Sequence, residues 1–252
     1  MQAIRGLKNA IAFLTILPVG MDDDALRQAA AYMPLFPIVG GIIGLLCGVS
    51  VWFLETLLPS SIAGFLGLGL ILLLTGAHHT DGLLDFGDAM MSHGSKKARL
   101  RVMRDLQTGT GGFTLGLVIL TTTALSIGAI DRSIIIPTLI ASEASAKFAM
   151  VSQAAFGKPA HRGMSTPFIK AMQGKGKWFR LGVALLLELV IGAATLHVVG
   201  LLLALFSLIV GLVMLAISSR AFGGITGDVL GASNDLARLL SIMTVVVTAK
   251  WL

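Results

Sequence analysis

The sequence predicts an all-α integral membrane protein: a single domain over residues 1–252, with about seven transmembrane helices and an N-terminal helix on the membrane surface. Hydrophobic residues make up 55% of the chain and charged residues only 13%, whereas soluble domains carry about 25% charged residues. The apolar residues gather in runs of about 20, the length that a bilayer core requires. Basic residues gather between alternate runs, which is typical of cytoplasmic loops.

The first segment, residues 1–19, is too short to cross a bilayer. Its apolar residues recur at helical spacing; they are Ile4, Leu7, Ile11 and Leu14. We expect an amphipathic helix on the membrane surface that stops at Pro18. A signal peptide is the alternative, but no small-residue cleavage site follows the apolar part. The run Asp22-Asp23-Asp24 is expected to cap a helix that starts near Ala25.

Seven apolar segments follow as predicted transmembrane helices, and the second continues without a break into a polar end. They are residues 34–58, 62–90, 113–130, 134–156, 178–198, 200–222 and 236–252. Because only two residues separate the fifth and sixth segments, the sequence leaves their division open. His197 lies at that junction, where we expect an interface residue rather than a ligand. Cys47 is the only cysteine, so no disulfide forms within the chain.

The distribution of basic residues predicts the orientation. Of the 19 Lys and Arg residues, Lys147 lies within a predicted span, Arg132 and Lys250 lie outside, and the other 16 fall on the side of the N-terminus. This bias predicts a cytoplasmic N-terminus, an external C-terminus and a multi-pass protein of the cell membrane. It also accounts for the net charge of +6 and the isoelectric point near 9.8, so we expect a lipid bilayer and no nucleic acid as partner.

The polar end of the second span carries three carboxylates at helical spacing. Asp81, Asp85 and Asp88 fall at i, i+4 and i+7, which places them on one helix face. Two such charges about 6 Å apart repel by roughly 3 kcal/mol at an effective dielectric constant near 20, so a cation is expected there. Hard oxygen ligands favour Mg²⁺. Gly82 and Gly87 leave room for a bulky phosphate ester; the alternative interpretation is a solvated helix end.

A second polar stretch precedes the third span. Arg101 and Arg104 lie one turn apart and lead into the glycines Gly109, Gly111 and Gly112. Free N–H groups at a glycine-rich helix start bind anions, and the two arginines are placed to clamp a phosphate. No Gly-Lys-Ser/Thr closes the stretch, so it is not a Walker A loop. A basic flank with a flexible loop is the alternative.

Three further segments combine polar and apolar residues. Glu143 and Lys147 lie at i, i+4 within the fourth span and predict an intramembrane ion pair, with a role in the substrate pocket as the alternative. The basic loop 157–177 predicts either a lid over an anionic substrate or an ordinary cytoplasmic loop. In the predicted loop 223–235, Asp228 is a second candidate metal ligand. Ser233 or Asn234 is expected to cap the last helix.

Together these segments resemble the cobalamin synthase family, whose members are adenosylcobinamide-GDP ribazoletransferases. The matching pieces are residues 13–18, 79–88, 102–105 with Gly109 and Gly112, and 226–232. They occur in the family's order over nearly the whole chain, and the Asp-rich piece is the specific one. The chain departs from the family's frequent basic residues at Ile16 and Gln107, and from its frequent Glu at Asp235 and Arg238.

The resemblance implies a Mg²⁺-dependent reaction that joins adenosylcobinamide-GDP to α-ribazole or its 5′-phosphate and releases GMP, the last assembly step of cobalamin biosynthesis. The implied metal ligands are Asp81, Asp85, Asp88 and Asp228. The implied substrate-binding residues are Arg101, Arg104, Gly109, Gly111, Gly112, Thr226 and Asn234. His79 or Asp105 would accept the proton of the attacking hydroxyl, and the sequence does not decide between them.

Two other classes of protein compete with this interpretation. CDP-alcohol phosphotransferases also hold Mg²⁺ on a membrane Asp cluster, but with a different order of Asp and Gly and a following Ala-Arg that this chain lacks. A cation-coupled transporter would use the three acids as an ion path, although such acids usually lie at the bilayer midplane. The sequence leaves the corrinoid pocket and the oligomeric state open, a homo-oligomer included.

Overall fold

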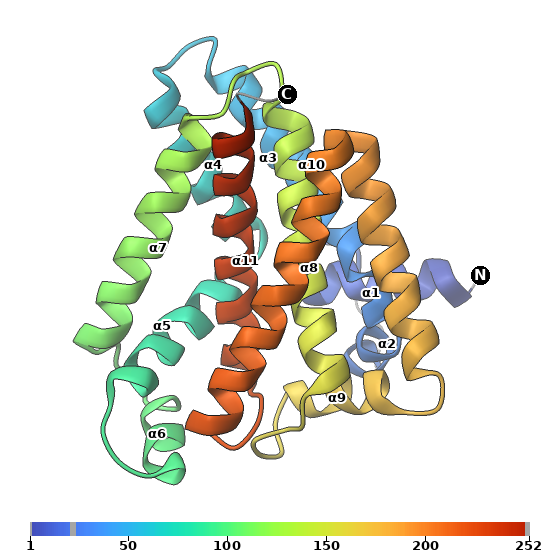
Figure 1. Cartoon of the computed structure of the whole chain (residues 1–252), viewed down its shortest axis with the longest axis vertical. Helices are drawn as coiled ribbons and strands as arrows, with labels where there is room; N and C mark the ends of the chain where they lie inside the picture. The colour runs from blue at the N-terminus through green and yellow to red at the C-terminus, as the bar shows by residue number, and fades with distance from the viewer. Residues whose placement is uncertain (1, 21–23, 250–252) are drawn as a thin grey trace.

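A computed structural model describes residues 2–20 and 24–249, and in these ranges the chain is all-α apart from loops. Eleven α-helices and one 3₁₀ helix form a bundle with shorter helices at one end (Figure 1). They are α1 (Gln2–Leu14), α2 (Ala25–Ala31), η1 (Met33–Leu35), α3 (Phe36–Leu54), α4 (Ser60–Leu74), α5 (His78–Met91), α6 (Lys96–Val102), α7 (Thr110–Gly128), α8 (Ile135–Phe156), α9 (Ser165–Gln173), α10 (Lys177–Ala221) and α11 (Gly227–Thr248).

Helix α8 is the centre of the bundle. Every residue from 141 to 155 is buried, and α3, α10 and α11 all pack against it. Its sequence is rich in Ala and Ser, small residues that let neighbouring membrane helices approach closely. The predicted N-terminal amphipathic helix is confirmed as α1. Of the predicted acidic cap, Asp22 and Asp23 lie outside the described residues. Asp24 occupies the N-cap position of α2, but its side chain makes no capping hydrogen bond.

The predicted uninterrupted span 62–90 is wrong, because the chain breaks between α4 and α5 and the two helices meet at 96°. Gly76 and Ala77 adopt left-handed backbone angles, with φ of 59° and 54°. The N–H of Ala77 donates to the carbonyl of Leu72 at 2.8 Å, and that of Gly76 donates to Leu73 at 3.0 Å. This pair of bonds is a Schellman motif, which ends a helix at a glycine. The acidic helix α5 therefore crosses the bundle instead of prolonging α4.

Helix α10 is two antiparallel arms joined at Leu196 and His197, whose backbone angles are not helical. A Cβ added at Gly192 would lie 2.6 Å from the carbonyl oxygen of Gly200, a contact that a straight helix does not allow. Figure 1 shows the reversal at the upper right. The predicted fifth and sixth spans are therefore separate, although the turn lies a few residues before the predicted division. His197 is at this turn and exposed, and it touches no site.

Among the described residues, four helices are long and apolar enough to cross a membrane: η1 with α3, α7, α10 and α11. The bent pair of α4 and α5 adds a fifth if it counts as one span. This is fewer than the seven predicted, because the two arms of α10 are counted as one helix, α4 is short, and α8 carries buried charged and polar residues. Helix α11 also begins nine residues before the predicted span 236–252, so most of the predicted loop 223–235 is helical.

The basic helices share one end of the bundle. In Figure 1, α6, α9 and both ends of the α10 hairpin lie at the bottom, whereas the α3–α4 and α7–α8 connections lie at the top with the turn of α10. The predicted loop 157–177 contains α9 and is tied to the α10–α11 connection. Ala160 donates its N–H to the carbonyl of Ile225 at 2.9 Å, and Ile225 donates to Lys158 at 2.8 Å. This segment is therefore anchored at its start.

Candidate active site

Four aspartates come together where α5 crosses the start of α11. Asp81 is exposed, and Asp85, Asp88 and Asp228 are half-buried. Gly82 is the contact point between the helices, because a Cβ there would lie 2.7 Å from the Cα of Asp228. Asp85 lies within electrostatic reach of the other three carboxylates. The structure thus brings Asp228, which is distant in sequence, to the predicted acidic face. We call Asp81, Asp85 and Asp228 the acidic cluster.

Asp88 has a separate partner at the start of α7. One carboxylate oxygen accepts the N–H of Gly109 at 2.7 Å, and the other accepts the N–H of Gly112 at 2.8 Å. The predicted anion site at this helix start therefore exists, but its anion is a side chain of the protein itself. Gly111 lies between the two bonds and is buried against α5. The three glycines consequently join α7 to α5, and their contact with a substrate stays a prediction.

Within the residues that the structure describes, no three His, Cys, Asp or Glu side chains are close enough to enclose a metal ion together. Mg²⁺ does not need such a cage, because it is commonly held by one or two carboxylates and completes its shell with substrate phosphate and water. The acidic cluster supplies hard oxygen donors, and Asp81 is open to solvent. The donor chemistry therefore fits a Mg²⁺ ion that binds together with a phosphate ester.

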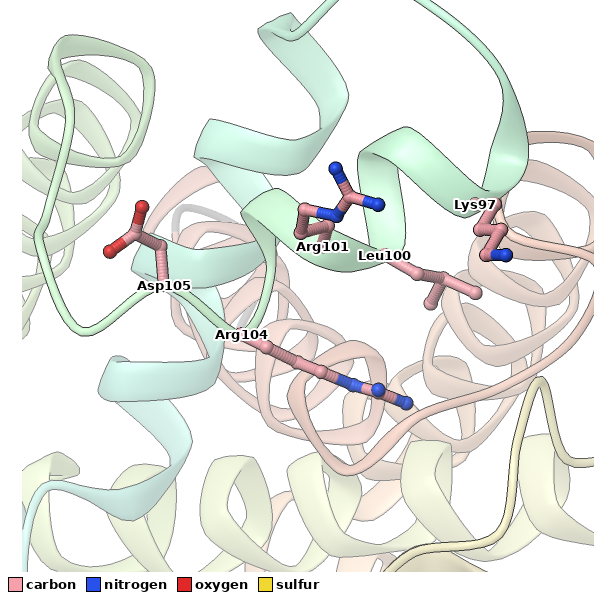
Figure 2. A pocket seen from close by; sticks show the side chains of 5 residues that line it. All are labelled: Lys97, Leu100, Arg101, Arg104 and Asp105. Atoms are coloured by element: carbon pink, nitrogen blue, oxygen red, sulfur yellow. The ribbon is translucent and has the colours of Figure 1, made fainter.

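A basic pocket of about 450 Å³ lies beside α6. Its lining residues are Lys97, Leu100, Arg101, Arg104 and Asp105. Figure 2 shows the three cationic side chains along one side of α6 and the loop that follows, while Asp105 points away from the Arg104 guanidinium. Three cations and one carboxylate give the pocket a net positive charge, which suits the binding of a phosphate group. The predicted pair of arginines is thus part of one cavity, which Lys97 completes.

The pocket is joined to the acidic cluster through Thr226. This residue is the N-cap of α11, where its hydroxyl oxygen accepts the N–H of Val229 at 3.2 Å. The same hydroxyl donates to the sulfur of Met103 at 3.3 Å, which places the end of α6 against the turn that carries Asp228. Thr226 is buried, and its predicted contact with substrate stays a prediction. The last helix was predicted to be capped by Ser233 or Asn234, but the structure shows that Thr226 caps it.

His161 lies near Asp228, in the segment 157–177 that the sequence left open as a lid or an ordinary loop. It lies in the anchored segment before α9 and acts electrostatically on Asp228. The contacts between Lys158, Ala160 and Ile225 bring this segment beside α11. A bridge between two loops has no local sequence pattern, so only the folded structure reveals it.

Beneath the site lies a buried network of four charged residues. The predicted pair of Lys147 and Glu143 is confirmed at 3.5 Å. Arg238 forms ion pairs with Glu143 and, at 2.6 Å, with Asp235. All four side chains are at most 1% exposed, and their charges sum to zero. Buried charges of this kind are costly unless they are paired, and here each one is.

One predicted site residue, Asn234, belongs to the network, and a second, His79, lies near it on α5. Asn234 accepts a hydrogen bond from Lys147 at 2.7 Å and donates one to Asp235 at 3.0 Å. It is fully buried, and the predicted substrate contact of Asn234 stays a prediction. His79 is only 6% exposed, and its Nδ1 has no hydrogen-bond partner. Its position between α5 and α11 keeps it away from the open face of the acidic cluster.

Comparison with known proteins identifies relatives over nearly the whole chain. The family model for cobalamin-5-phosphate synthase matches residues 6–246. Three proteins named adenosylcobinamide-GDP ribazoletransferase are similar. That of Methanocella arvoryzae is 37% identical over 95% of this chain and 94% of its own length. That of Methanococcoides burtonii is 31% identical over 96% of this chain and 93% of its own length. That of Methanopyrus kandleri is 33% identical over 91% of this chain and 92% of its own length. No solved structure matches.

Proposed function

The chain belongs to the cobalamin-5-phosphate synthase family, and we propose that it transfers the phosphocobinamide group of adenosylcobinamide-GDP to α-ribazole or its 5′-phosphate. GMP is released, and the product is adenosylcobalamin or its phosphate, in the last assembly step of cobalamin biosynthesis. The observation that carries the proposal is the match over residues 6–246 to relatives of that activity. The acidic cluster beside the basic pocket provides the two kinds of group that a diphosphate ester needs.

We propose that one or two carboxylates of the acidic cluster, drawn from Asp81, Asp85 and Asp228, hold Mg²⁺ when the diphosphate is present. The ion would neutralise charge on the diphosphate and on the leaving GMP. Asp88 serves this site indirectly, since its bonds to Gly109 and Gly112 fix α5 against α7. The two glycines are therefore assigned to the framework and not to the substrate.

The basic pocket would bind the phosphate that leaves with guanosine as GMP. A hydroxyl oxygen of the ribazole attacks the phosphorus attached to cobinamide, and the bond from this phosphorus to the bridging oxygen breaks. Arg101, Arg104 and Lys97 would stabilise the negative charge that develops on the departing phosphate. The attacking hydroxyl loses a proton, which we assign to Asp105 because this carboxylate is exposed at the pocket, whereas His79 is buried.

We propose seven membrane crossings, made by α3, α4, α7, α8, the two arms of α10 and α11. Helix α5 then lies along the cytoplasmic surface, since it meets α4 at 96°. The 16 basic residues of the predicted inner segments support a site on the cytoplasmic side of a cell-membrane protein. Single-cysteine labelling in a Cys47→Ser background tests this orientation, with positions 97 and 170 expected to be inaccessible from outside intact cells. Labelling of either position from outside would refute it.

The decisive experiment is GMP release from adenosylcobinamide-GDP by detergent-purified protein in the presence of ribazole and Mg²⁺. We expect release that requires both additions and that fails in Asp81→Asn. A CDP-alcohol phosphotransferase would release CMP from a CDP-alcohol and no GMP. A transporter would release neither nucleotide. Absence of GMP from folded protein would therefore exclude the proposed reaction.

A further inference from the structure

A second cationic cavity, of about 560 Å³, lies at the same end of the bundle and shares no residue with the basic pocket. It is formed where the end of α8, the end of α9 and the two ends of the α10 hairpin meet. The lining residues are Ala155, Phe156, Gly157, Lys158, Gln173, Lys177, Leu215 and Ser219. Nothing in the proposed reaction uses this cavity.

The lining is amphiphilic, and its described residues include no carboxylate. Lys158 and Lys177 supply two positive charges, Gln173 and Ser219 supply polar groups, and Ala155 and Leu215 supply an apolar floor. Such a combination suits a ligand with both an anionic and a hydrocarbon part. A free phosphate ion would leave the apolar floor without a partner.

Lys177 is held in place by two aromatic rings. Its ammonium nitrogen lies 4.5 Å from the ring centroid of Phe156 and 5.0 Å from that of Trp178. Cation–π contacts orient the ammonium but leave its N–H groups free to donate to an anion. Gln173 donates to the carbonyl of Gly157, so one of the carbonyls at the end of α8 is already satisfied. This reduces the repulsion that a helix C-terminus would exert on an anion.

The position of the cavity indicates a membrane ligand. Lys177 begins α10, one of the helices that qualify as a membrane span. The next two residues, Trp178 and Phe179, are 71% and 76% exposed. Exposed aromatic residues at the end of a membrane helix are typical of the lipid headgroup level, and basic pockets between such helices on the cytoplasmic side bind anionic headgroups.

We propose that this cavity binds the phosphodiester headgroup of an anionic phospholipid, with Lys158 and Lys177 on the phosphate and the glycerol region over Leu215. The site is independent of the proposed reaction. A basic residue near an anionic membrane surface contributes about 1 kcal/mol, which corresponds to about a fivefold change in affinity for each lysine. Removal of both charges is therefore expected to weaken retention of the lipid by roughly 25-fold.

Native mass spectrometry tests the site on the full chain purified in micelles that contain phosphatidylglycerol and phosphatidylcholine. Wild type should retain phosphatidylglycerol selectively, and Lys158→Gln/Lys177→Gln should lose it. Lys170→Gln/Lys175→Gln is the matched control, because it removes two exposed lysines of the same segment that do not line the cavity, and it should behave as wild type. Lys177→Arg keeps the charge and the ring contacts and should retain the lipid, which separates loss of binding from misfolding.

Four outcomes would overturn the proposal. Equal loss in the control pair would indicate general surface attraction, and equal retention of the two lipids would exclude recognition of a net anionic headgroup. Displacement by millimolar inorganic phosphate would indicate a soluble phosphate ligand instead. Displacement by adenosylcobinamide-GDP would assign the cavity to the substrate.

Discussion

The hydroxyl of Thr80 donates a hydrogen bond of 2.8 Å to Asp235, and this contact joins the two helices that carry the acidic cluster. Thr80 precedes Asp81 on α5, and Asp235 lies two turns after Asp228 on α11. Asp235 is in turn held by Arg238, which pairs with Glu143 on α8. The spacing of Asp81 and Asp228 is therefore fixed by a buried network that extends to the centre of the bundle.

We expect Thr80→Val to leave an oxygen of the buried Asp235 carboxylate without a donor. The loss should lower the free energy of unfolding by about 1–3 kcal/mol, the cost of an unsatisfied buried group. Thr80→Ser keeps the hydroxyl and should be close to wild type. Thermal unfolding in detergent measures stability, and the Mg²⁺ concentration for half-maximal GMP release measures the site. A Thr80→Val protein that matches wild type in both would show that this bond does not position α5.

The acidic cluster can be separated from an ordinary solvated helix end by its response to metal. Asp81→Asn and Asp85→Asn keep the side-chain shape but remove a charge, and each should lower kcat by about 10²–10³-fold, as loss of one preorganised electrostatic group does. Binding linkage predicts that Mg²⁺ with substrate raises the melting temperature of wild type more than that of either variant. Without metal, the variants should be at least as stable as wild type, because repulsion among the carboxylates is relieved. Full turnover by both variants would contradict the proposed metal site.

Asp88 should behave differently from its neighbours on α5. In Asp88→Asn the two N–H groups at the start of α7 lose a charged acceptor, so the free energy of unfolding should fall by about 1–2 kcal/mol, as for loss of a helix cap. The stabilisation by Mg²⁺ with substrate should persist. Differential scanning fluorimetry with and without the two ligands distinguishes the cases. A variant with wild-type stability and no metal response would instead make Asp88 a ligand.

The sequence predicted most of the bundle helices because apolar runs of the right length have few other interpretations. It missed the break at Gly76 because the residues after it keep a helical pattern, and a helical pattern carries no information about the angle between two helices. The glycine directly after an apolar run was the available signal. Residues 227–235 were predicted as loop because they are polar. Their partners, among them Lys147 and Thr80, lie on other helices.

Within the site, the sequence correctly predicted that Asp81 and Asp85 share one helix face, because a spacing of four residues determines this in any α-helix. The partner of Asp88 could not be predicted, since it depends on the start of α7, which is 21 residues away. The burial of His79 and Asn234 could not be predicted from the sequence either, because residue type alone does not show how a side chain is packed. Chemical identity thus indicated which residues matter, and the packing of α5 on α11 determines which of them a substrate can reach.

The basic pocket is the part of the proposal that discriminates between the two substrates. Arg104→Ala removes a charge-assisted contact of about 1.5–3 kcal/mol, so kcat/KM for adenosylcobinamide-GDP should fall by about 10- to 100-fold. The KM for α-ribazole, which carries no phosphate, should change little. Arg99→Ala is the matched control, because Arg99 lies on the same short helix but lines a separate cavity. Steady-state kinetics with each substrate varied in turn gives both constants. Equal loss for both substrates, or equal loss in the Arg99 control, would show that α6 supports the fold and that Arg104 does not hold the leaving phosphate.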